Sequence, residues 1–176
     1  MSQILPVVHI LSKVLILFSA AFILPLAISL GLDDGAHLAY DEAIAATFAS
    51  GVVLWLISRS GRRELHTRDG FLLVVLIWAI LPLYSTIPLM ANLPDLSFTD
   101  AYFEAVSGLT ATGATVLSGL DDLPPSINVW RTEMHWIGGM GVIVLVVAVL
   151  PMLGVGGRQL FKAETPTPMK DSKLTP

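Results

Sequence analysis

The chain has 176 residues, of which 54% are hydrophobic and only 14% charged, and its formal net charge is −4. Its mean hydropathy is +0.74. A soluble domain needs a charged surface, and disordered or nucleic-acid-binding chains need charges spread along them, so this composition excludes all three classes. The absence of cysteine excludes disulfides and cysteine-bound metals. We therefore expect an all-α integral membrane protein.

Four stretches approach the length of about 20 mostly apolar residues that a membrane-spanning helix needs. The first covers residues 4–30 and the second, which is shorter, residues 43–57. The third covers residues 71–91 and the fourth residues 136–155. They predict four transmembrane helices, between the last two of which one re-entrant pore helix and a filter loop are expected.

The connections between these stretches differ in the sign of their charge. Residues 33–42 and 92–130 contain Asp and Glu but no Lys or Arg, whereas residues 59–68 and the tail after residue 155 are rich in basic residues. Arg131 is the one basic residue on the acidic side. Because basic residues are retained in the cytoplasm, both termini are predicted to be cytoplasmic and both acidic connections to lie outside.

The long third connection is predicted to contain a short helix over residues 100–107. Ser97 or Thr99 can cap its start, Asp100 lies in the first turn where the helix dipole favours an anion, and Gly108 suits its end. Eight residues span about 12 Å, which is less than half of a bilayer. A re-entrant half-helix is therefore expected.

The short helix is followed by the small, uncharged residues of the predicted filter, Thr110, Ala111, Thr112 and Gly113. Irregular backbone is tolerated at membrane depth only where it is buried in protein or lines a water-filled path. Backbone carbonyls can replace the hydration shell of K⁺, and glycine permits the backbone angles that this needs. These residues are the predicted K⁺ site, with an ordinary outer turn as the alternative.

Other residues have simpler expected roles. Gly138, Gly139 and Gly141 in the fourth helix are expected to allow close packing, with a gating hinge as the alternative. Arg131 is expected to anchor the helix at the interface or to form a local ion pair. The acidic residues of the first connection, Asp34 among them, are expected to be solvated.

Three segments of the sequence resemble a known family. The sequence SGLTATGATV at residues 107–116 is similar to the first filter loop of the Trk/Ktr family of potassium-uptake proteins. The sequence HWIGGMG at residues 135–141 resembles the start of the helix that follows this loop in Trk-type members. Residues 162–171 resemble the Trk-type connection to the next repeat, so that the similarity extends over essentially the whole chain.

This resemblance implies a division of the chain into three parts. Residues 1–60 would form an N-terminal transmembrane helix pair, and residues 61–160 the first helix–pore loop–helix repeat. Residues 161–176 would form a cytoplasmic connection. Family members contain four such repeats around a shared axis, and this chain contains one. It is therefore expected to be a fragment of a longer protein, with self-assembly of copies or a separate partner chain as the alternatives.

The resemblance also implies a function and a set of partners. The function is potassium uptake across the inner membrane of a prokaryote, without enzyme activity or a bound cofactor, and K⁺ is the transported ion. The implied partners are membrane lipid, the missing pore repeats, a second copy of the full-length protein and a cytosolic nucleotide-binding regulatory subunit, but no nucleic acid. A non-conducting scaffold and a sodium-permeable pore are the alternative functions. An intramembrane enzyme would need a nucleophile–base or metal cluster that the spans lack.

Overall fold

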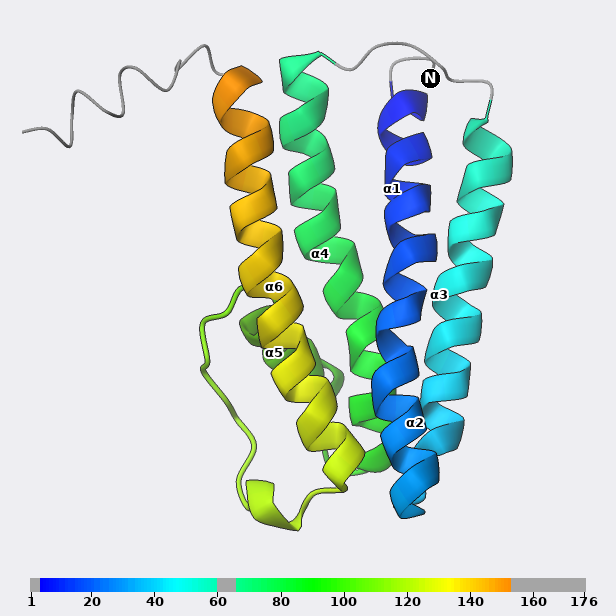
Figure 1. Ribbon diagram of the computed structural model, residues 1–176, viewed down its shortest axis with the longest axis vertical. Coiled ribbons are helices and arrows are strands. Elements are labelled where there is room, and N and C mark those ends of the chain that lie inside the picture. The colour runs from blue at the N-terminus through cyan, green and yellow to red at the C-terminus, as the bar shows by residue number, and fades with distance from the viewer. Residues whose placement is uncertain (1–3, 60–65, 153–176) are drawn as a thin grey trace, which may run out of the picture.

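The computed structural model describes residues 4–59 and 66–152, with the side chains of residues 67 and 144–152 left aside, and within these ranges it is helical without any strand. The long helices run alongside one another, and α5 lies in one half of the bundle (Figure 1). The all-helical fold expected from the sequence is thus confirmed. The elements are α1 (Leu5–Phe18), the 3₁₀ turn η1 (Ser19–Phe22), α2 (Ile23–Leu32), α3 (His37–Ser58), α4 (Thr67–Asn92), α5 (Phe98–Leu109), the 3₁₀ turn η2 (Leu120–Asp122) and α6 (Pro125–Met152).

Three helical stretches of the described residues are long and apolar enough to cross a membrane, namely Leu5–Leu32, His37–Ser58 and Arg68–Asn92. The first joins α1, η1 and α2 into one span. Pro25 has no N–H to donate to the carbonyl four residues earlier, which explains why the helix tightens into a 3₁₀ turn just before it. The second span is longer than the predicted residues 43–57. Hydropathy did not detect its first turns because they carry exposed polar residues.

The fourth predicted helix starts earlier than expected. Hydropathy predicts residues 136–155, but α6 begins at Pro125, and residues 153–155 lie outside the described part of the chain. Proline is well suited to the first position of a helix. Hydropathy did not detect this start because its first turns are polar. Polar groups there find partners on other helices, as the ion pair between Arg131 and Glu104 illustrates.

Helix α4 is hydrogen-bonded to other helices close to its two internal prolines. Pro82 and Pro88 leave two α4 carbonyls without an intrahelical donor. Next to these carbonyls, the Tyr102 hydroxyl of α5 donates to the Ala79 carbonyl at 3.0 Å. The Trp130 indole N–H of α6 likewise donates to the Ser85 carbonyl at 3.2 Å. Hydrogen bonds therefore join α4 to both of the helices that flank the predicted filter.

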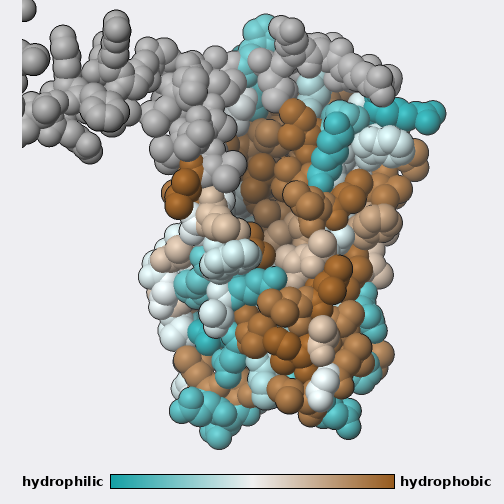
Figure 2. All heavy atoms as spheres, in the orientation of Figure 1, coloured by the Kyte–Doolittle hydropathy of each residue, from teal (hydrophilic) through white to brown (hydrophobic). Residues whose placement is uncertain are grey.

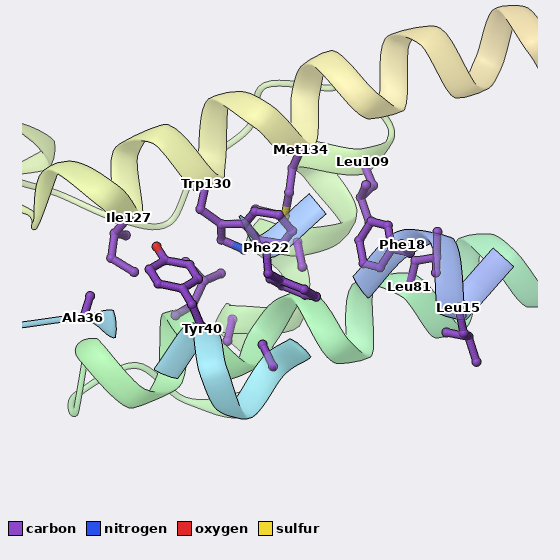
Figure 3. Close-up of a cluster of buried hydrophobic side chains, with 14 residues drawn as sticks. Leu15, Phe18, Phe22, Ala36, Tyr40, Leu81, Leu109, Ile127, Trp130 and Met134 are labelled. Carbon is purple, nitrogen blue, oxygen red and sulfur yellow. The ribbon is translucent and has the colours of Figure 1, made fainter. Parts of the chain in front are cut away.

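The hydrophobic core combines side chains of α1, η1, α3, α4, α5 and α6 (Figure 3). Trp130 is fully buried, and its ring centroid lies 4.5 Å from that of Phe22. Phe22 in turn meets Phe18 edge-to-face, with the centroids 5.6 Å apart, and the buried Tyr40 of α3 belongs to the same cluster. The N-terminal helices and α4, α5 and α6 therefore share one core.

Large apolar side chains also cover much of the exterior (Figure 2). Leu17 is 76% exposed, Val75 63% and Ile57 62%. Such a surface is unfavourable in water and favourable in lipid. Together with the three spans, it identifies a membrane protein.

Candidate functional site

Helix α5 is the predicted re-entrant helix, but it is longer than the predicted residues 100–107. Ser97 is its N-cap, accepting a hydrogen bond from the Asp100 backbone N–H at 3.2 Å and donating to the Asp100 carboxylate at 2.7 Å. Gly108, predicted to end the helix, instead lies within it. A Cβ on Gly108 would come 3.0 Å from the Cβ of Met134, so the small residue lets α5 approach α6 closely.

Helix α5 ends in a Schellman motif built from the predicted filter residues. The Ala111 N–H donates to the Gly108 carbonyl and the Thr112 N–H to the Ser107 carbonyl, both at 2.9 Å, with Thr110 as the C-cap. Ala111 adopts a positive φ of 55°, a conformation that glycine usually occupies and that costs other residues roughly 1–2 kcal/mol. The chain is thereby turned sharply at the end of the short helix.

The predicted filter residues lie together on an open face. Residues 110–116 are exposed, and Gly113 has a φ of 77° with no atom within 4 Å of where a Cβ would lie. The hydroxyl of Thr110 donates to the Val106 carbonyl at 2.8 Å and lies 2.7 Å from the hydroxyl of Thr112. Both hydroxyl groups are thus held near the C-terminal end of α5. Within the described residues, no group of three or more His, Cys, Asp or Glu is placed to hold a metal ion.

The segment after the predicted filter is held by one buried carboxylate, that of Glu104, which is 4% exposed. Its Oε1 accepts hydrogen bonds from the backbone N–H of Val116 at 2.6 Å and of Leu117 at 3.4 Å, and from the Thr115 hydroxyl. Its Oε2 accepts from Nη2 and Nε of Arg131 at 3.3 and 3.4 Å. The carboxylate therefore joins α5, the returning loop and α6.

Glu104 was not among the predicted site residues. The ion pair expected for Arg131 is present, and Glu104 is its partner. The pattern of charges in the sequence could have indicated this pair. Arg131 is the one basic residue on the acidic side of the chain, and Glu104 is a carboxylate in the middle of an otherwise uncharged stretch of α5. Two isolated opposite charges on consecutive helices are candidates to pair, because an unpaired buried charge is costly.

The three glycines of α6 lie in different surroundings. A Cβ on Gly138 would lie 2.1 Å from the Leu109 carbonyl oxygen, a distance that real Cβ atoms do not reach. A Cβ on Gly139 would meet nothing within 4 Å, and one on Gly141 only the edge of Trp78 at 3.9 Å. Gly138 therefore marks the point where α6 crosses the backbone at the end of α5.

Asp34, expected to be solvated, instead joins the N-terminal helices to α6. Its carboxylate accepts from the Ser126 backbone N–H in the first turn of α6 at 2.9 Å, from the Ala36 N–H at 3.1 Å and from the Ser29 hydroxyl. Burial raises the pKa of this carboxyl, but these hydrogen bonds outweigh that effect and hold the pKa at about 2. The ionised Asp34 thus serves as a cap for α6 from a distant part of the chain.

Comparisons with known proteins agree with this architecture. The family model of TrkH, a cation transport protein, matches residues 37–176. The chain is 48% identical to the Trk system potassium uptake protein TrkH of Halomonas elongata and 46% identical to that of Escherichia coli K12. Each match covers 97% of this chain and about a third of the relative, 36% and 35% respectively. The crystal structure of the potassium transporter TrkH from Vibrio parahaemolyticus matches with a TM-score of 0.82 at 41% identity, over 92% of this chain and 36% of that one. The chain therefore belongs to the TrkH family of cation transport proteins.

Proposed function

We propose that this chain forms one quarter of a potassium-conducting pore, as part of a TrkH-type potassium uptake system. The K⁺ site would be lined by the backbone carbonyls of Thr110, Ala111, Thr112 and Gly113. The observation that carries the proposal is the geometry at the end of α5, where a half-spanning helix ends in an exposed, turned stretch of small residues.

The backbone conformation of this stretch supports a carbonyl-lined path. The φ angle is −88° at Thr110, 55° at Ala111 and 77° at Gly113. Glycine at a positive φ permits backbone angles that most residues avoid, which a carbonyl-lined path needs. The C-terminal end of α5 adds the negative end of a helix dipole, which favours a cation. Four such loops would replace the hydration shell of K⁺.

Family membership and charge support the remaining features of the proposal. Family membership favours the inner membrane of a prokaryotic cell. The acidic connections, together with the basic residues at 59–68 and in the tail, favour an orientation with both termini in the cytoplasm. The missing repeats would come from the same longer polypeptide. The family resemblance supports a homodimer of the full-length protein and a cytosolic nucleotide-binding regulatory subunit as partners.

The test is potassium uptake by a chimera in a bacterium that lacks its own potassium transport. This chain replaces the matching first third of Escherichia coli TrkH, and a second version carries Gly113→Asp. Since a Cβ at Gly113 meets no neighbour, the substitution leaves packing intact but adds a side chain at positive φ and a charge on the predicted path. We expect the chimera to take up K⁺ and Gly113→Asp to abolish uptake at an unchanged level in the membrane.

The other outcomes separate the alternatives. Normal uptake with Gly113→Asp would contradict the filter assignment and favour the non-conducting scaffold. Uptake of Na⁺ as fast as K⁺ by the unmodified chimera would favour the sodium-permeable pore. Uptake by the 176-residue chain alone would indicate that copies assemble into a complete ring.

A further inference from the structure

We propose that Glu104 is a positioning residue for the ion path. It acts as a hydrogen-bond acceptor for the Thr115 hydroxyl and the backbone N–H groups of Val116 and Leu117, rather than as one half of an ion pair. The inference rests on the proposed function, since it concerns the same loop. The ion pair with Arg131 fixes the position of the Glu104 carboxylate. The carboxylate in turn fixes the position of the segment that follows the predicted filter.

The backbone after the filter has few other partners. Among the described residues, the hydrogen bonds from the N–H groups of Val116 and Leu117 go to Glu104 and to the hydroxyl of Thr115, which itself donates to Glu104. Irregular backbone near the hydrocarbon region cannot leave such donors without acceptors. The position of this segment therefore depends on where the Glu104 carboxylate is held.

The donors around the site suit a carboxylate of this length. One oxygen meets three donors and the other meets the Arg131 guanidinium, so that every group facing the carboxylate is a donor. Glutamine would turn an NH₂ group towards donors on one of the two sides. Aspartate is shorter by one methylene group and cannot reach both. Arg131 is well fitted to fix the carboxylate, because its planar fork contacts both Glu104 and the Thr115 hydroxyl, the latter at 3.2 Å.

Through Glu104 and Arg131, the position of α6 influences the position of residues 115–117. Glu104 lies on α5, six residues before the first residue of the predicted filter, Thr110, and Arg131 lies on α6. Residues 115–117 directly follow the predicted filter at 110–113. A shift of this segment by a fraction of an ångström would change the spacing of the oxygens that an ion meets, and ion selectivity is sensitive to that spacing.

The experiment uses the chimera described above and measures uptake of K⁺ and Na⁺, with the KM and maximal rate for K⁺ and the amount of protein in the membrane. The variants are Glu104→Gln, the charge swap Glu104→Arg with Arg131→Glu, and Thr115→Val. Asp100→Asn is the matched control, because it removes a carboxylate from the same helix that binds only at the helix start. Thr115→Ser, which keeps the hydroxyl, is the control for Thr115→Val.

We expect Glu104→Gln to lower the ratio of potassium to sodium uptake by about tenfold, the effect of losing one charge-assisted hydrogen bond. We expect the swap not to restore the ratio, because an arginine at 104 cannot accept from the backbone. Thr115→Val should give a smaller change in the same direction, and both controls should match the unmodified chimera.

Two results would overturn the inference. Restoration of the unmodified ratio by the charge swap would mean that the ion pair alone matters. Thr115→Val keeps both charges, so it tests the hydrogen bonding to Glu104 without the ion pair. An unchanged ratio and KM in this variant would mean that hydrogen bonding to Glu104 does not influence the ion path, and this test stands even if Glu104→Gln fails to accumulate in the membrane. Either result leaves the proposed function standing, because that proposal depends on the separate effect of Gly113→Asp.

Discussion

At the scale of single residues, Gly138 and Gly139 form a natural pair for a test of packing. Gly138→Ala would place a methyl group against the Leu109 carbonyl, which belongs to the backbone and cannot rotate away. We expect it to lower the free energy of unfolding by about 2 kcal/mol or more and to reduce uptake. Gly139→Ala has open space and should be neutral or slightly stabilising, since alanine favours the helix. Thermal melting of the purified chimera measures the difference. Equal melting temperatures for the two variants would contradict the close crossing of α5 and α6.

The residues that sequence could predict are those fixed by local chemistry. Ser97 was one of two candidate caps because a serine three residues before an aspartate is a local signal, and the structure selects it. Glu104 and Arg131 are separated by 27 positions, and no local rule joins them. The positive φ of Ala111 could not be predicted either. The Schellman motif imposes it, and alanine, unlike glycine, does not indicate such a conformation.

At the scale of the elements, Asp34 links the turn between α2 and α3 to the start of α6. Its pKa of about 2 lies below the ordinary value of 3.8, so its ionised form stabilises the fold fully above about pH 4. This contribution is lost as the pH falls from about 4 towards 2. We expect Asp34→Asn to lower stability by about 1 kcal/mol at neutral pH, and its melting temperature to converge with that of the unmodified protein in this window. Asp33→Asn, at the exposed neighbouring position, is the control. A difference that persists at pH 2 would show that the charge is not what matters.

The bounds of the helices show why hydropathy locates spans better than it locates their ends. The apolar centres of all four predicted spans lie within described helices. The ends differ where polar residues continue a helix. Helix α3 extends back to His37 through exposed charged residues, and α6 extends back to Pro125 because Glu104 and Asp34 satisfy its polar first turns. A window of apolar residues cannot detect groups whose partners lie on another helix.

At the scale of the whole molecule, the predicted orientation can be tested directly because the chain contains no cysteine. A single cysteine introduced at Ser118, which is exposed in the loop before η2, should react with a membrane-impermeant maleimide added to intact cells. A cysteine at Ser172, in the basic tail, should react only after the membrane is permeabilised. Labelling of Ser172→Cys in intact cells would reverse the proposed topology. Ser172 lies outside the described residues, and its expected side follows from charge alone.

The contact between Asp34 and Ser126 joins residues 92 positions apart. During synthesis, the N-terminal helices therefore enter the membrane long before their partner helix exists. Until α6 emerges, the Asp34 carboxylate lacks the donor from Ser126, and Phe18 and Phe22 lack the indole of Trp130 that later covers them. The order of the chain thus leaves the first three spans incompletely packed until α6 has been made. Packing of α6 is the step that completes the core and fixes the end of α5 against Gly138.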